Sequence, residues 1–249
     1  MLFRSADAFE ITKGAEGHLA ETPAPAPDGS QVAVVVKVAG RRHLAVMNQD
    51  GQGSQALAAS LDIQGAPDWS PDGRAIAAAA RDAEGTGLFA IPVDGGAPRR
   101  LASGPSTDPE WLATDPAWSP NGDFLVYSGQ FSGGTASARS AGAPLHAVRA
   151  DGMAHDLPRA TTATGTREAL RVSPGGYRFL DQTHLVFRKN PESPDFWLFD
   201  LVTGDQRQLT KLTNKGSLRG FDITPDGKHI VFDRTQQNSD IVLIDRPKK

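Results

Sequence analysis

Short apolar runs recur along the chain, each following a polar turn rich in proline, aspartate and glycine. The runs occupy residues 32–36, 75–80, 124–127, 185–187 and 230–232. They are continuously apolar rather than alternating, which is typical of β-strands covered on both faces. The turn, Ser/Thr-Pro-Asp/Asn-Gly, suits a type I turn because proline presets φ and glycine tolerates the backbone that follows.

The same phrase returns at a regular interval. It is "PDWSPDGRAIA" from Pro67, "PAWSPNGDFLVY" from Pro116 and "FDITPDGKHIVF" from Phe221, with a degenerate copy, "APAPDGSQVAVV", from Ala24. The aligned turn glycines are 44, 49, 54 and 51 residues apart, at Gly29, Gly73, Gly122, Gly176 and Gly227. Periods of about 40–50 residues are typical of β-propeller blades.

Each unit continues with the signals of two more strands. A third apolar run is followed in most units by a glycine turn, such as Asp50-Gly51 or Asp94-Gly95-Gly96, which favours a hairpin. Short fourth strands follow at "PRRLA" from Pro98 and "QRQLT" from Gln206. The sequence therefore predicts an all-β fold, a β-propeller of four-stranded antiparallel blades that forms a single domain over residues 1–249.

Five blades are favoured because the ends of the chain complement each other. The last unit, residues 220–246, stops after its third strand, and residues 6–12 resemble the fourth strand at residues 204–210. We expect residues 9–12 to pair with residues 241–244 and close the ring, which removes two exposed sheet edges. The alternative is that residues 1–12 are the remnant of another blade, in a fragment of a six-bladed or larger propeller.

Composition narrows the range of partners. A net charge of −3, from 26 basic and 29 acidic residues, gives no basic footprint for nucleic acid. The chain has no cysteine, so disulfides and thiolate chemistry are excluded. No window reaches the roughly 18 apolar residues that would span a bilayer, so we expect no membrane insertion. The first residues lack the pattern of a signal peptide, which indicates a cytoplasmic protein, or a mature or partial chain.

No catalytic motif is found, so we expect a protein that is not an enzyme and needs no cofactor. The segment Gly51–Gln55 does not match the nucleophile-elbow pattern, because Gly53 stands in place of the serine and Gln55 in place of the last glycine. The six histidines show no metal-binding spacing. Trp69 and Trp118 occupy the same position in successive units, which favours packing between blades over ligand binding.

Loop lengths suggest where binding occurs. The turns on one face are short, whereas the loops predicted for the other face are long, at residues 102–115, 129–144, 160–171 and 211–220. Long loops on a rigid scaffold are frequent binding sites. The candidate binding residues on this long-loop face are Glu110, Trp111, Arg167, Arg171, Lys215 and Arg219. The alternative is that these loops are tolerated insertions.

The repeated phrase "PDWSPDGRAIA", followed by "LFAIPVDGGAPRRL" from Leu88, resembles the WD-like propeller repeats of the TolB family. The likeness covers about residues 24–246. TolB proteins bind the lipoprotein Pal in the bacterial periplasm and are not enzymes. The resemblance therefore implies a propeller that binds a protein or peptide partner, including a cell-envelope protein, in the periplasm.

This chain departs from the TolB pattern in several respects. It shows five units rather than six, it has no N-terminal α/β domain, and its fourth unit lacks the Asp-Gly turn. Similar repeats also occur in bacterial kinases, transcription regulators and serine peptidases. The alternative function is therefore a ligand-sensing or accessory propeller domain of a larger kinase, regulator or serine hydrolase.

Overall fold

The structure is a computed structural model, and it describes residues 18–104, 112–130, 142–162, 164–190, 195–212, 217–224 and 226–235. All regular elements in these residues are β-strands. The side chains of a few strand residues at the edges of these ranges, Arg219 among them, are outside the described part.

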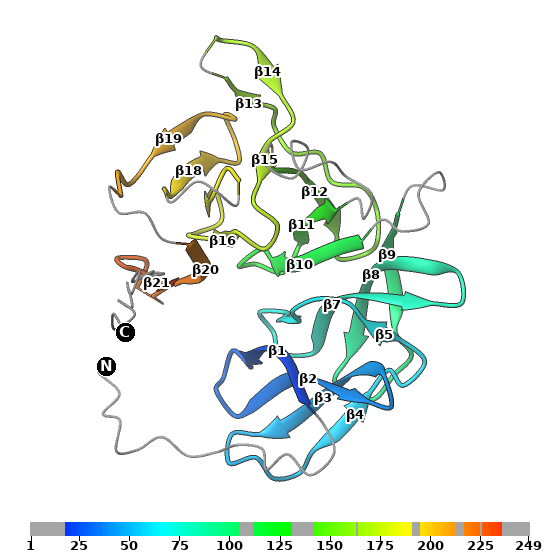
Figure 1. Cartoon of the computed structure of the whole chain (residues 1–249). Helices are drawn as coiled ribbons and strands as arrows, with labels where there is room; N and C mark the ends of the chain where they lie inside the picture. Colours follow the sequence, from blue (N-terminus) through cyan, green and yellow to red (C-terminus); the bar gives the residue numbers. More distant parts are fainter. Residues whose placement is uncertain are drawn as a thin grey trace, which may run out of the picture.

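The strands form successive antiparallel sheets that follow one another around an arc, with their first strands toward its centre (Figure 1). The first blade has the order β1 (His18–Pro25), β2 (Gln31–Val38), β3 (Arg41–Asn48) and β4 (Gln55–Leu57). In the second blade, β5 (Asp62–Ile63) and β6 (Asp68–Trp69) both pair with β7 (Ala75–Asp82), which is followed by β8 (Gly85–Pro92) and β9 (Arg99–Ser103).

The third blade has the order β10 (Leu112–Trp118), β11 (Phe124–Gln130), β12 (Ala143–Arg149) and β15 (Arg171–Val172), and a separate hairpin is formed by β13 (Ala160–Thr161) and β14 (Arg167–Glu168). The fourth blade contains β16 (Tyr177–Phe179), β17 (His184–Phe187), β18 (Trp197–Asp200) and β19 (Gln206–Gln208). Described strands of the fifth blade are β20 (Ser217–Ile223) and β21 (Ile230–Thr235). The predicted all-β propeller of four-stranded antiparallel blades is confirmed.

The repeated turn phrase is structural. In the second blade the Gly73 amide donates to the Ser70 carbonyl at 2.9 Å, and the Ser70 hydroxyl donates to Asp72 at 2.7 Å and accepts from the Ala75 amide at 2.9 Å. Gly73 has a φ of +70°, a conformation that favours glycine. The same hydrogen bonds recur around Ser119 and Thr224, so the same turn precedes the second strand in three blades.

The alignment of Gly176 with the turn glycines is wrong. Its amide closes a turn on the Ser173 carbonyl at 2.8 Å, but this turn precedes the first strand of the fourth blade. The turn between the first two strands is formed instead by Asp181, whose carboxylate accepts the Thr183 amide at 2.8 Å. An Asx turn has replaced the proline–glycine turn there, so the phrase "SPGG" marks a connection between blades.

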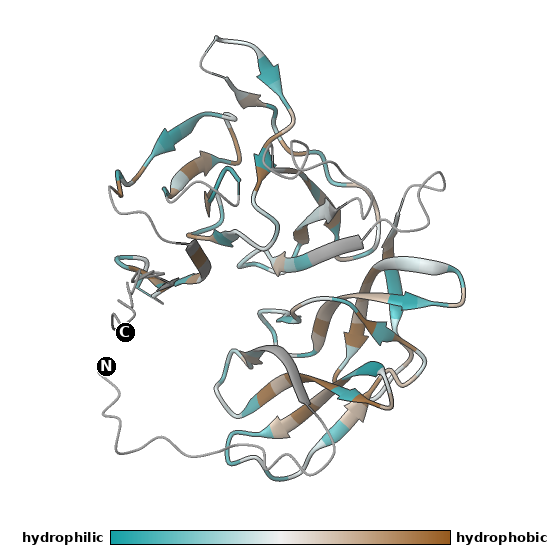
Figure 2. Cartoon of the chain, in the orientation of Figure 1, coloured by the Kyte–Doolittle hydropathy of each residue, from teal (hydrophilic) through white to brown (hydrophobic). Residues whose placement is uncertain are grey.

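Buried side chains join each blade to the next. Trp69 is 6% exposed, and its indole donates to the Ala24 carbonyl of the first blade at 2.8 Å. Trp118 is packed with apolar residues of the second and third blades, which confirms the structural role predicted for both tryptophans. Apolar residues concentrate in the strands, notably β2, β3, β7 and β8 (Figure 2).

A buried hydroxyl joins the third and fourth blades. Tyr177 is 0% exposed; its hydroxyl donates to the Asp115 carbonyl at 2.7 Å and accepts from the Ser128 amide at 2.9 Å. Burial raises the pKa of Tyr177, which keeps the hydroxyl protonated. The Asp115 carboxylate accepts the Ala66 amide at 3.0 Å, which extends the link to the second blade.

The predicted closure of the ring involves residues 9–12 and 241–244, which lie outside the described residues, and it stays a prediction.

Deleting residues 1–13 tests this closure. If residues 9–12 complete the last blade, the deletion exposes two strand edges and should lower the melting temperature by about 10 °C or cause aggregation. Thermal unfolding followed by circular dichroism measures the effect. A chain lacking only residues 247–249 is the control, and an unchanged melting temperature after the first deletion would disprove the closure.

Candidate functional site

The outer strand of the third blade is interrupted. After β12, the chain forms a bridge between Val148 and Ala154, and it pairs again with β12 at β15, where Arg171 lies opposite Pro144 and Val172 opposite Ala143. Between these two pairings, residues 156–169 leave the sheet and carry the β13–β14 hairpin, which projects from the rim of the propeller (Figure 1). We call residues 156–169 the insertion.

Loop lengths in the sequence predicted residues 160–171 as a loop of the long-loop face. That assignment is wrong, because β15 returns to complete the third blade before the chain enters the fourth. The insertion is polar and has no hydrophobic periodicity, so the sequence pattern predicts no regular structure for it.

The insertion docks against the fourth blade. The Thr161 amide donates to the Gly204 carbonyl at 3.0 Å, and the Gln206 side chain donates to the Thr161 carbonyl at 2.7 Å. Gly204 has a φ of +80°, and a Cβ at this position would lie 2.3 Å from the Arg159 carbonyl oxygen. The approach of the two backbones therefore requires glycine.

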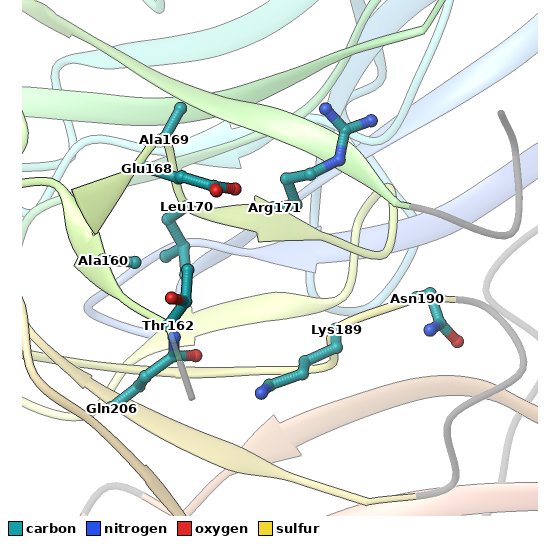
Figure 3. A pocket seen from close by; sticks show the side chains of 9 residues that line it. All are labelled: Ala160, Thr162, Glu168, Ala169, Leu170, Arg171, Lys189, Asn190 and Gln206. Carbon is teal, nitrogen blue, oxygen red and sulfur yellow. The ribbon is translucent and has the colours of Figure 1, made fainter. Parts of the chain in front are cut away.

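Between the insertion and the fourth blade lies a cavity of about 240 Å³, which we call the flank pocket (Figure 3). Its lining residues come from the insertion, from β15 and from the fourth blade: Ala160, Thr162, Glu168, Ala169, Leu170, Arg171, Lys189, Asn190 and Gln206. Two cations and one carboxylate thus surround a small space with an apolar wall at Leu170.

Lys189 supplies a partly buried positive charge in the flank pocket. Its ammonium lies 3.4 Å from the centroid of the Trp197 ring, a cation–π contact. Within the described residues it has no ion-pair or hydrogen-bond partner, and burial lowers the pKa of Lys189. A partly desolvated cation without a counter-ion lowers stability relative to a paired one, and a ligand that carries an anion would offset this cost.

Arg171 and Glu168 occupy the opposite wall. A terminal nitrogen of Arg171 donates to the Gly142 carbonyl, and this bond holds the guanidinium at the rim. Figure 3 shows Arg171 pointing away from Lys189, whereas Lys189 extends toward Thr162 and Gln206. Arg171 therefore contributes a fixed positive charge at the rim, while Lys189 supplies the donor inside.

A second cavity, of about 460 Å³, lies on the other side of the insertion and shares Ala169 and Leu170 with the flank pocket. Its two histidines are each stacked on an aromatic ring. His146 lies 5.5 Å from Tyr127, and His155 lies 4.2 Å from Phe124, between ring centroids. This stacking gives both histidines a packing role.

A charged cluster faces the centre of the arc. Asp68, Arg178 and Asp222 occupy the same register position in the first strands of the second, fourth and fifth blades. Arg178 Nε lies 3.9 Å from Asp222 Oδ1, and Asp68 accepts the Trp118 amide at 2.8 Å. Burial raises the pKa of Asp68 to about 6, although Arg178 acts in the opposite direction.

The structure brings together only some of the candidate residues from the sequence. Arg171 lines the flank pocket, whereas Arg167 is exposed on the hairpin and does not line it. Glu110, Trp111 and Lys215 lie outside the described residues, as does the side chain of Arg219.

Neither the flank-pocket residues of the fourth blade nor the central charged cluster was predicted from the sequence. The missed residues are Lys189, Asn190, Gln206, Asp68, Arg178 and Asp222. The two carboxylates had a detectable signal, because Asp68 and Asp222 stand one residue before the position that tryptophan occupies in the second and third units. Arg178 had no such signal, because its unit was misaligned at Gly176. Lys189 had none.

Comparison with known proteins identifies the repeats. The sequence profile of the TolB β-propeller domain matches residues 7–141, more than half of the chain. The chain belongs to the TolB β-propeller family. This result confirms the resemblance found in the turn phrases. No curated protein sequence matches the chain.

Solved structures show the same fold. A TolB-type protein from Agrobacterium tumefaciens is 20% identical, with a TM-score of 0.50, over 75% of this chain and 63% of that one. TolB from Acinetobacter baumannii is 14% identical, with a TM-score of 0.52, over 76% of this chain and 45% of that one. Oligogalacturonate lyase from Vibrio parahaemolyticus is 14% identical, with a TM-score of 0.60, over 90% of this chain and 61% of that one.

The chain thus spans less than two thirds of the length of each of these proteins. At these identities the likeness shows the fold alone. In the described part of the chain, no helix is long and apolar enough to cross a membrane. The same residues contain no group of three or more metal-binding side chains.

Substituting Gly204 tests the docking of the insertion. Gly204→Ala places a Cβ against the Arg159 carbonyl and should cost about 1–3 kcal/mol beyond the cost of its positive φ. Gly165→Ala is the matched control, because Gly165 has a φ of +81° with no atom within 4 Å of the added Cβ. Urea unfolding measures both variants, and equal destabilisation would contradict the close approach.

The central cluster predicts a pH dependence. Because the folded-state pKa of Asp68 is raised to about 6 from 3.8, the folded protein keeps this proton at pH values where the unfolded chain has lost it. The stability contributed by Asp68 is therefore present below about pH 4 and declines as pH rises to about 6, by at most about 3 kcal/mol.

Asp68→Asn should remove this decline while keeping an oxygen acceptor for the Trp118 amide. The free energy of unfolding, measured between pH 4 and pH 8, should fall less in the variant than in the natural chain. Asp156→Asn, which neutralises an exposed carboxylate, is the control. Parallel pH profiles for all three proteins would show that Asp68 is not perturbed.

Proposed function

We propose that this chain is a non-catalytic TolB-like propeller that binds a protein or peptide partner. The binding surface includes the flank pocket and the adjoining long-loop face. The observation that carries the proposal is Lys189, a partly buried cation in a concave site that has no counter-ion among the described residues. Such a site gains free energy when a ligand supplies the missing partner.

The scaffold around this site supports binding. Lys189 follows directly after Arg188, a buried residue whose guanidinium donates to the Leu218 carbonyl of the fifth blade at 3.0 Å. The opposite wall is held by the docking of Thr161 on the fourth blade. A site whose walls are fixed before binding loses little conformational entropy when a partner arrives.

The partner that we propose is a cell-envelope protein or a peptide segment of one, with the periplasm as the compartment. This part of the proposal rests on membership of the TolB family, two of whose structural relatives are TolB proteins. The mixed polar and apolar lining of the flank pocket suits a moderate and reversible interaction.

A second candidate function is that of an accessory domain in a longer protein. A prolyl endopeptidase structure with a TM-score of 0.56 aligns with 90% of this chain but only 33% of its own length. A propeller like this one is therefore compatible with a longer chain that has its own catalytic part. The sequence of the flanking reading frame separates the two functions directly.

Peptide selection tests the binding function. The intact chain, immobilised, is used to select binders from a displayed library of random peptides. Selected peptides should bind in the micromolar range and lose at least about tenfold in affinity for Lys189→Met, because the variant lacks the charge that they neutralise. Fluorescence polarisation measures the affinities.

Arg81→Met is the matched control for this experiment, since Arg81 is exposed on β7 of the second blade, away from the flank pocket. It should leave the affinity unchanged. A failure to select any binder, or binders that ignore Lys189, would overturn the proposed site.

A further inference from the structure

The donors inside the flank pocket limit what it can bind. The Lys189 ammonium offers up to three N–H groups, and none is used by an acceptor among the described residues. Gln206 already donates to the Thr161 carbonyl. The principal free donor of the pocket is therefore a single ammonium group, at the side nearest Thr162 and Gln206 (Figure 3).

The charge balance sets the class of ligand. Arg171, Lys189 and Glu168 give the lining a formal charge of +1, which disfavours a cationic ligand. Glu168 adds repulsion that grows with the charge of an anion, so a monoanion fits better than a dianion such as phosphate. Phosphate sites usually provide several Arg side chains or backbone amides together, whereas this pocket offers one free ammonium.

The size of the cavity sets an upper limit on the ligand. A volume of about 240 Å³ holds one amino-acid residue rather than a folded segment. The apolar wall at Leu170 and Ala160 can accept the carbon atoms next to a charged group. A carboxylate on a short side chain or at a chain end fits these features. The cation pairs with its charge, the apolar wall contacts its carbon atoms, and the small volume encloses it.

We infer that the flank pocket binds a carboxylate group of a peptide, with Lys189 as its direct ion partner and Arg171 as a fixed charge at the rim. The group is either a free C-terminal carboxylate or an acidic side chain. This inference rests on the proposed function and specifies the chemistry that the site recognises. Binding also places a counter-ion beside Lys189, so the pKa of its ammonium rises on binding.

Tryptophan signals in NMR spectra provide a local test. The chain has four tryptophans, and the Trp197 ring lies directly beneath the Lys189 ammonium. The probes are N-acetyl-glycyl-alanine as the free acid, its amide, and N-acetyl-glutamic acid amide, each added at about 10 mM to the intact chain. The Trp197 indole resonance is assigned with Trp197→Phe.

Acid probes should shift the Trp197 resonance with saturation, whereas the amide probe should not. Comparison of the two acids distinguishes a chain end from an acidic side chain. Lys189→Met should weaken the response at least about tenfold, and Arg167→Met, which removes an exposed charge of the same insertion outside the pocket, should leave it unchanged.

An equal response to acid and amide probes, or an unchanged response in Lys189→Met, would overturn the inference. Its failure is distinguishable from failure of the proposed function. Selected peptides that depend on Lys189 but bind equally well after all their carboxylates are amidated would keep the binding function and remove carboxylate recognition. Absence of any selected peptide would remove the binding function itself.

Discussion

The contacts between blades are the constraint on which the rest of the structure depends. A four-stranded sheet with both faces apolar is not stable alone, so each blade needs the faces of its neighbours. Polar bonds fix how these faces meet: the Trp69 indole joins the first two blades, and the Tyr177 hydroxyl joins the third and fourth. Both bonds end on backbone carbonyls of a first strand, at Ala24 and Asp115, so the inner strands set the angle at which each blade follows the last.

Sequence patterns predicted those features that repeat. The turn at Ser70–Gly73 and the strand after it could be predicted because proline, aspartate and glycine have fixed roles in the backbone geometry, and the copies at Ser119 and Thr224 reinforce one another. The fourth blade was misaligned at Gly176 because an Asx turn at Asp181 performs the same task with different residues. The flank pocket was found only in part, through Arg171, because Lys189 and Gln206 reach it by tertiary contacts that have no periodicity.

The insertion shows how a repeat fold acquires an individual site. The outer strand of a blade has a free edge, so extra residues can leave it between Ala154 and Arg171 without disturbing the inner strands. Docking on the fourth blade then fixes the insertion and requires glycine at position 204, because a Cβ there would collide with the facing Arg159 carbonyl oxygen. Two cavities result, one on each side, from a segment with only two short strands of its own.

Charge is distributed unequally between the centre and the rim of the propeller. At the centre, Arg178 lies 3.9 Å from Asp222, and its charge also lowers the pKa of Asp68, so the protein itself supplies opposite charges there. In the flank pocket the positive charges exceed the negative ones, and among the described residues Lys189 contacts the quadrupole of an indole ring instead of a carboxylate. The central cluster adjusts stability with pH. Under the proposed function, the charge of Lys189 serves a partner.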